Sequence, residues 1–346
     1  MITTTPAGSA DLTGPVGPND VTEIRDLRDA LDRVIAPIVL DPDAGARAPS
    51  LSQAQEETHL ASDPGFDIRT LFPAPMNTPV DAGPYFYLGL LHGTDPETDH
   101  SDVTIHRICV QGRDELSIFF TLGHHIDTFR AKIGATGRPL PTTINMRLGP
   151  AIAVGACFEA PTTPFGYDEL QIASGLHRRA VEFVRARTIE QRSLARAEVV
   201  VEGELLPDRR VAEDQDTDTD TGHAMPEFPG YDGPANQVLS VMRVAAVTAR
   251  HDSILHTLVR SGEEYMSLVG IPTEASLLHA LFSHVLDPSQ QPAYDPRLSV
   301  KGTTAKTIYD AIYPWVTHAE FERAQFFDVD PGPWLAAAAA CTVEDR

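Results

Sequence analysis

The chain has 346 residues, 42% hydrophobic and 22% charged, which is enough to bury a full core in one large domain or two smaller ones. Its formal net charge of -22 argues against binding to nucleic acid or to an anionic membrane, because affinity for polyphosphate depends on an excess of Lys and Arg. Residues 1–20 contain neither the basic nor the apolar segment of a signal peptide, and the three cysteines are widely spaced. We therefore expect a cytoplasmic protein without a disulfide framework.

In chain order, the first predicted element is a helix over residues 21–38, where apolar residues recur at steps of three and four. From Leu71 onward the patterns indicate mainly strands, beginning with a hairpin made of VTIHRICV and LSIFFTL. Later strands are predicted for TTINMRLG, AIAVGACF, AEVVVEGELL and NQVLSVMRVAAVTAR, and a helix begins in YDELQIASGL. The acidic run in residues 212–222 has nothing to bury and is predicted to be a mobile loop.

Two groups of residues suggest a binding site. Asp102, His125 and Glu169 are each suitable ligands for a divalent ion, although their wide spacing gives no local metal-binding signature and a surface or helix-capping role for the His is the alternative. Arg107 lies in a predicted strand, where a buried guanidinium needs an anionic partner such as Glu227, a phosphate or a carboxylate substrate. An ordinary surface position for this Arg is the other interpretation.

Several segments in order resemble the UbiD family of reversible decarboxylases. They are VDAGPYFYLGLLHGTDPETDHSDVTIHR, GHHIDTF, RLGPAIAVGACFEAP, YDELQIASGL, AEVVVEGELLP, PEFPGY and VAAVTARHDSILHTLV, which together cover roughly residues 70–285. The resemblance implies an α+β fold with a split β-barrel flavin-binding core and flanking helices. The chain would then divide into a disordered lead-in (1–20), a shortened helical or irregular region (21–70), the core (71–286) and a linker with a short tail (287–346).

The resemblance also implies a cofactor, prenylated FMN, whose phosphate is bridged to the protein by Mn2+ or Mg2+, with K+ as a further candidate. Asp102, where the family has Asn, would bind the divalent ion together with His125 and Glu169. Arg107 falls on the catalytic Arg and Glu227 on the proton donor. The cofactor would be bound by Thr104, Ile105, His106, His124, Ala156, Cys157 and Phe158, and the substrate would face Thr121, His124 and Phe228.

Two departures from the family pattern leave alternatives open. The family has a second Glu five residues before the proton donor, where this chain has Gly222, so the network is predicted to be incomplete with His223 as a stand-in. The segments outside the core are also short, which predicts that most of the usual C-terminal domain is missing and that the chain forms a homo-oligomer or joins a second subunit.

The resulting prediction is a non-oxidative decarboxylase of an aromatic or α,β-unsaturated carboxylic acid, supplied with its cofactor by a flavin prenyltransferase. One alternative is a non-catalytic, cofactor-binding subunit of a heteromeric enzyme. Another is a metal-dependent hydrolase that uses Asp102, His124 and His125, although no ordered motif supports it.

Overall fold

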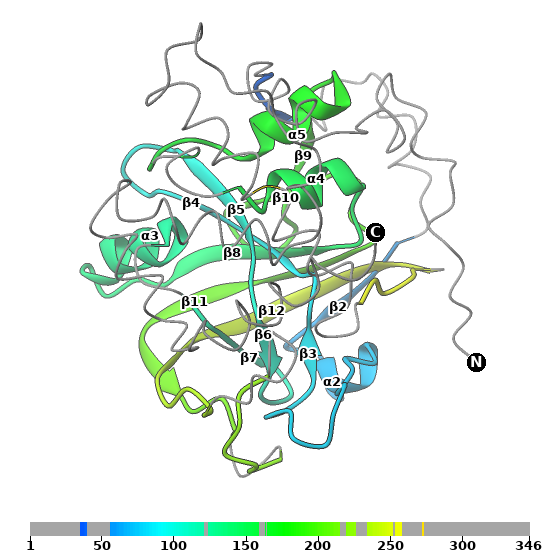
Figure 1. The fold of residues 1–346 in the computed structure, drawn as a ribbon, viewed down its shortest axis with the longest axis vertical. Coiled ribbons are helices and arrows are strands. Elements are labelled where there is room, and N and C mark those ends of the chain that lie inside the picture. The colour runs from blue at the N-terminus through cyan, green and yellow to red at the C-terminus, as the bar shows by residue number, and fades with distance from the viewer. Residues whose placement is uncertain are drawn as a thin grey trace, which may run out of the picture.

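The computed structural model describes residues 35–39, 56–120, 124–158, 163, 165–214, 219–225, 234–251, 253–257 and 272. One large antiparallel sheet dominates these residues, and a small sheet with two short helices packs beside one part of it (Figure 1). The strands of the large sheet are β2 (Glu56–Leu60), β3 (Tyr85–Phe86), β4 (Leu90–Thr94), β5 (Ser101–Ile105), β6 (Ile108–Val110), β7 (Glu115–Ile118), β8 (Leu140–Met146), β11 (Val199–Val211) and β12 (Leu239–Arg250). The small sheet contains β1 (Ile38–Val39), β9 (Glu182–Arg185) and β10 (Arg192–Leu194). The helices are α2 (Ile68–Leu71), α3 (His125–Gly134), α4 (Pro150–Gly155) and α5 (Leu170–His177).

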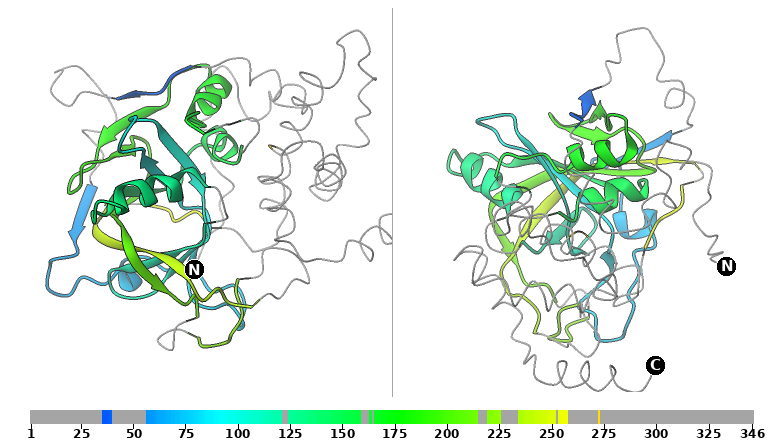
Figure 2. Two further views of the ribbon diagram at one scale, coloured as in Figure 1. Left: turned by 90° about the vertical axis from the view of Figure 1, so that its left-hand side faces the viewer. Right: turned by 45° about the horizontal axis from the view of Figure 1, so that its top comes forward.

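The large sheet is curled, and its strand order shows why. The order is β3-β6-β7-β12-β11-β8-β4-β5, with β2 paired to the second half of β12. The two longest strands, β11 and β12, lie at the centre, and their pairing register shifts after Glu202 and again after Leu205. Such irregularities bend a strand and increase its twist, which allows the sheet to curl toward a barrel (Figure 2). The fold therefore confirms the predicted α+β class with a split β-barrel.

A two-residue connection brings the two ends of this sheet together. β5 is the last strand of the sheet order and β6 is the second, yet only His106 and Arg107 separate them along the chain. With two intervening residues, the last Cα of β5 and the first Cα of β6 can be about 11 Å apart at most, so the edges of the sheet must approach each other at this point. The predicted continuous strand VTIHRICV is accordingly divided, because β5 pairs with β4 whereas β6 pairs with β3 and β7.

Two hydrophobic cores lie on opposite faces of β4 and β5. Leu91 belongs to the larger core, which combines the central strands with α2 and α3, while the adjacent Leu90 belongs to a core shared with α4, α5 and the small sheet. Val103 points into that second core. Because successive side chains of a strand alternate between faces, Asp102 and Thr104 are directed to the opposite side.

One predicted strand is a helix in the structure. The segment AIAVGACF contains α4, which begins at Pro150, and Pro is well suited to the first turn of a helix because its missing N–H would be unpaired there. The small residues then serve helix packing, since a Cβ on Gly155 would lie 2.9 Å from the Cβ of Ala173 in α5. The apolar run was therefore misread, whereas the helix predicted to begin in YDELQIASGL is confirmed by α5.

The predicted boundaries also need revision. Because β2 pairs with β12 over residues 56–60, the core begins before the expected limit at residue 71. The helix predicted over 21–38 lies mostly outside the described residues, and at its end Ile38 and Val39 form a strand that pairs in parallel with β9. The expected lead-in, the limit at residue 286 and the tail also lie outside the described residues.

No helix in the described part of the chain is long and apolar enough to cross a membrane.

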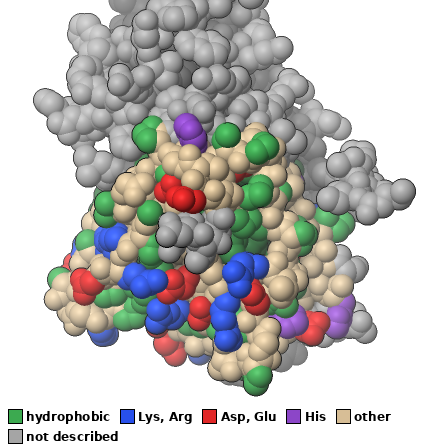
Figure 3. All heavy atoms as spheres, turned by 90° about the horizontal axis from the view of Figure 1, so that it is seen from below, with side chains coloured by type: hydrophobic (Ala, Val, Ile, Leu, Met, Phe, Trp, Pro, Cys, Tyr) green, Lys and Arg blue, Asp and Glu red, His purple; other side chains and the backbone are tan. Residues whose placement is uncertain are grey.

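On the face seen from below, basic and acidic side chains lie beside one another (Figure 3). Among the ion pairs of the described residues, Glu115 is paired with Arg209 at 2.7 Å and with Arg243 at 3.0 Å.

Candidate functional site

The three predicted metal ligands lie together although they come from three separate elements. Asp102 is in β5, His125 is the first residue of α3, and Glu169 immediately precedes α5. One ligand atom from each lies within 4.8 Å of the other two. Nδ1 of His125 is 3.2 Å from Oδ1 of Asp102, and the hydroxyl of Thr104 donates a hydrogen bond of 3.1 Å to Oδ2. The tertiary structure thus assembles the cluster that spacing alone could not reveal.

The electrostatics of this cluster favour a cation. Asp102 and Glu169 are each only 3% exposed. Burial, reinforced by the neighbouring Asp102, raises the pKa of Glu169 well above its ordinary value. Burial alone would also raise the pKa of Asp102, but hydrogen bonds involving His125 and Glu169 outweigh it and lower that pKa. Among the described residues, Oε2 of Glu169 has no hydrogen-bond partner. A divalent ion would satisfy this oxygen and cancel the repulsion between the carboxylates.

Arg107, in the connection between β5 and β6, forms a buried ion pair. Its Nε lies 2.8 Å from Oε1 of Glu213, and its Nη2 donates a hydrogen bond of 3.2 Å to Oε2. The Glu213 side chain is fully buried and that of Arg107 is 11% exposed. The guanidinium also lies 4.6 Å from the ring centre of Phe119. An ion pair in such surroundings needs further hydrogen bonds to offset the lost hydration of its charges.

Glu213, which the sequence analysis did not single out, is the acidic partner of Arg107 in the structure. The second acidic residue was expected at position 222, which is Gly222, with His223 in its place, but the carboxylate that pairs with Arg107 comes from further upstream. His223 lies in the short described segment 219–225, where its backbone pairs with Pro234. Glu213 lies two residues after the end of β11 but seven residues beyond the predicted strand AEVVVEGELL, so the sequence pattern gave no signal for it.

The acidic loop is also more ordered at its ends than predicted. Glu213 is buried, and on the far side the hydroxyls of Thr219 and Thr221 donate to the carbonyl oxygens of Asp81 and Val80 at 2.7 and 2.9 Å. Residues 215–218 lie outside the described residues. The two ends of the predicted mobile loop are thus hydrogen-bonded or buried in the structure.

The predicted cofactor-binding residues fall in three places around the same strand. Thr104 and Ile105 end β5 and His106 follows, His124 precedes α3, and Ala156, Cys157 and Phe158 follow α4. The ring centres of His106 and His124 lie 4.7 Å apart, so the end of β5 and the start of α3 are in contact. Ala156 and Ile105 pack in one hydrophobic cluster, so the segment after α4 also lies beside the end of β5. Phe158 is buried against Ile172 and Leu176, so its side chain belongs to the core.

The predicted residues Thr121, Glu227 and Phe228 lie outside the described residues.

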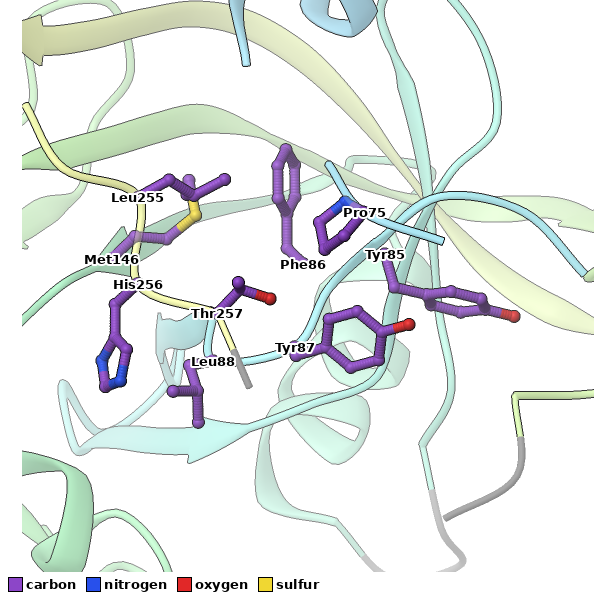
Figure 4. Close-up of a pocket in the computed structure, with 9 residues that line it drawn as sticks. All are labelled: Pro75, Tyr85, Phe86, Tyr87, Leu88, Met146, Leu255, His256 and Thr257. Carbon is purple, nitrogen blue, oxygen red and sulfur yellow. The ribbon is translucent and has the colours of Figure 1, made fainter. Parts of the chain in front are cut away.

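A small, mostly apolar pocket that the sequence did not reveal lies near the ion pair. Its lining comes from Pro75, Tyr85, Phe86, Tyr87, Leu88, Met146, Leu255, His256 and Thr257. The rings of Tyr85 and Tyr87 project to the same side, away from the segment that carries His256 (Figure 4). Tyr85 links the pocket to the ion pair, because its hydroxyl donates a hydrogen bond of 2.9 Å to Glu213.

Comparison with known proteins places this site in a family. Residues 48–263 match the UbiD family, described as the 3-octaprenyl-4-hydroxybenzoate carboxy-lyase Rift-related domain. The match covers more than half of the chain, and the chain belongs to this family. The resemblance drawn from the ordered segments is thus confirmed.

Individual relatives are similar over much of the chain. Gallate decarboxylase from Lactiplantibacillus plantarum is 43% identical over 88% of this chain and 79% of its own length. The structure of a 3,4-dihydroxybenzoic acid decarboxylase from Enterobacter cloacae is 52% identical, with a TM-score of 0.67, over 76% of this chain and 52% of that one. The UbiD-class enzyme HmfF from Pelotomaculum thermopropionicum, in complex with prFMN, is 31% identical, with a TM-score of 0.65, over 76% and 56% of the two chains. The chain thus spans about half the length of these solved structures.

The buried ion pair generates a stability prediction. Arg107→Met and Glu213→Leu should each lower the free energy of unfolding by about 3 kcal/mol or more, because each leaves one buried charge without its partner. The double variant should recover part of the loss. Urea denaturation of the two single variants and the double variant measures this. Additive losses in the double variant would contradict the pairing.

Proposed function

We propose that the chain is a non-oxidative decarboxylase of a hydroxylated aromatic carboxylic acid that uses prenylated FMN. The observation that carries this proposal is the position of Arg107: it is paired with buried Glu213 and lies five residues after Asp102 of the metal-type cluster. Residues 102–107 therefore begin with Asp102, a member of the cluster suited to a metal ion, and end with Arg107, a cation suited to a substrate carboxylate. The names of the gallate and 3,4-dihydroxybenzoic acid decarboxylases support a phenolic acid as the substrate class.

In this proposal, Arg107 binds the substrate carboxylate and Glu213 holds the guanidinium in one orientation. The bond between the carboxylate carbon and the ring carbon breaks, CO2 leaves, and the electron pair remains on the organic fragment. Prenylated FMN, when bound, supplies the electron sink for this pair. Glu227 then gives its carboxyl proton to the ring carbon and regains one from water. His124, Thr121 and Phe228 face the substrate, and His223 is kept as a further candidate for the catalytic network.

The cluster of Asp102, His125 and Glu169 is proposed to bind Mn2+ or Mg2+, with K+ as a further candidate nearby. The fit rests on two buried carboxylates, one imidazole and the unpaired Oε2 of Glu169. Thr104, Ile105, His106, His124 and the backbone of residues 156–158 would bind the flavin beside it. Asp102, His125 and Glu169 would hold the ion, which would supply positive charge for binding the flavin phosphate.

A heteromeric enzyme remains the second candidate. It is favoured by the name of one neighbour, the Sedimentibacter hydroxybenzoicus vanillic acid decarboxylase ShVdcCD, for which a separate component ShVdcD is also named. The absence of a Glu at position 222 was one argument for a non-catalytic subunit, and the pairing of Arg107 with Glu213 weighs against it. We propose a homo-oligomer or a heteromer in the cytoplasm, with a flavin prenyltransferase as the supplier of its cofactor.

The function is tested by co-expressing the chain with a flavin prenyltransferase. The purified protein should carry prenylated FMN by absorption and mass spectrometry, and should release CO2 from 3,4-dihydroxybenzoate or gallate. A protein that binds flavin but does not act on any phenolic acid would support the non-catalytic alternative. A protein that binds no flavin would refute both.

Flavin and metal binding should be coupled, because the ion cancels repulsion between the carboxylates and the flavin phosphate. His125→Ala and Glu169→Gln should each lower both Mn2+ and flavin content, measured on the same sample by metal analysis and absorption. Glu182→Gln, in the small sheet, is the control and should keep both. Full flavin occupancy with loss of metal would show that the ligand assignment is wrong.

Glu227→Gln should bind flavin normally but lose turnover by about 100-fold or more, as removal of a positioned acid does. Glu57→Gln, on the exposed part of β2, should keep normal turnover. Steady-state CO2 release measures both variants. Near-normal turnover in Glu227→Gln would exclude it as the proton donor.

A further inference from the structure

Tyr85 in β3 is a buried phenol whose hydroxyl contacts the carboxylate that pairs with Arg107. It is fully buried, and its hydroxyl donates a hydrogen bond of 2.9 Å to Oε1 of Glu213. Burial, together with the charge of nearby acidic groups, raises the pKa of Tyr85, so the phenol keeps its proton and remains a donor.

The Glu213 carboxylate is fixed from three directions. Oε1 lies near Nε of Arg107 and accepts the Tyr85 hydrogen bond, while Oε2 accepts from Nη2 of Arg107 and from the backbone N–H of Asn236 at 3.2 Å. The main chain is held as well, because its N–H donates to the carbonyl of Asn236 at 2.8 Å and its carbonyl accepts from Gln111 at 2.9 Å. Of the side chains other than Arg107 described here, Tyr85 is the one shown to hydrogen-bond to this carboxylate.

A carboxylate with free rotation about its last bond could turn and take the guanidinium with it. The Tyr85 hydroxyl opposes this, because it lies on the same oxygen as Nε of Arg107 and is attached to a rigid ring. The ring is itself fixed by burial and by contact with Tyr87, whose ring centre is 5.9 Å away. Orientation at a reacting group has large effects on rate, since small displacements remove reactive geometries.

We propose that Tyr85 is a positioning residue, which holds Glu213 so that the Arg107 guanidinium is presented to the substrate carboxylate in one orientation. This inference rests on the proposed decarboxylase function for the role of Arg107. The hydrogen bond from Tyr85 to Glu213 is independent of that function.

The chain offers a matched control in Tyr87. Tyr87 is also buried, lies two residues away and belongs to the same pocket lining (Figure 4). Its hydroxyl, however, donates to Oδ2 of Asp81 at 3.2 Å, a carboxylate that also accepts from Thr78 and Asn77. Tyr85→Phe and Tyr87→Phe therefore each remove one buried hydroxyl and keep the ring, but only the first changes the Arg107–Glu213 pair.

The test is a double-mutant cycle on the full chain, loaded with prenylated FMN by co-expression. Tyr85→Phe should lower kcat/KM for 3,4-dihydroxybenzoate about tenfold, with flavin content unchanged, as expected for loss of one hydrogen bond to a charged group. In a Glu213→Gln background the same change should have an effect of about twofold or less, because no charged pair is left to position. Tyr87→Phe should keep kcat/KM within about twofold in both backgrounds.

An equal loss from Tyr85→Phe in both backgrounds, or an equal loss from Tyr87→Phe, would overturn the proposal in favour of a general packing role. Urea denaturation of the same variants gives a readout that does not need activity. The midpoint should fall more for Tyr85→Phe in the native background than in the Glu213→Gln background. If no acid is turned over, the proposed function fails, while equal midpoint shifts in the two backgrounds would show that Tyr85 does not act on the pair.

Discussion

The curl of the large sheet forces its two edges together where β5 leads into β6. Only His106 and Arg107 bridge these strands, although the strands lie near opposite ends of the sheet order. The two flanking strands have different neighbours, because β5 pairs with β4 whereas β6 pairs with β3 and β7. Polar side chains can therefore gather at this split, with Asp102 before it and Arg107 after it. The barrel shape and the site have one geometric origin.

Two sets of buried charged residues lie beside this split, and the cost of burying their charges is offset in different ways. At Glu213 the protein supplies the compensation itself, through Arg107, Tyr85 and the N–H of Asn236. At the other group, Asp102 and Glu169 are buried together with one imidazole, and burial raises the pKa of Glu169. The first arrangement is complete and suited to holding a cation in place, whereas the second is suited to receiving one.

The segment before β3 links the pocket to the acidic loop. Tyr85 contacts Glu213 at the start of that loop, and the backbone of Val80 and Asp81 accepts from Thr221 and Thr219 near its end. Both ends of the acidic loop are therefore held by the same short stretch of chain, which fixes Glu213 at its start.

The sequence by itself determined the family, the split-barrel class and the residues Asp102, His125 and Glu169 that cluster in the structure, because these follow from ordered motifs and local patterns. It misread AIAVGACF, since a short apolar run with small residues has no period that separates a buried helix from a strand, and only packing of Gly155 against α5 decides. It also could not find the pairing of Glu213 with Arg107. That contact joins residues more than a hundred positions apart, and it depends on how far the sheet curls, which no local spacing records.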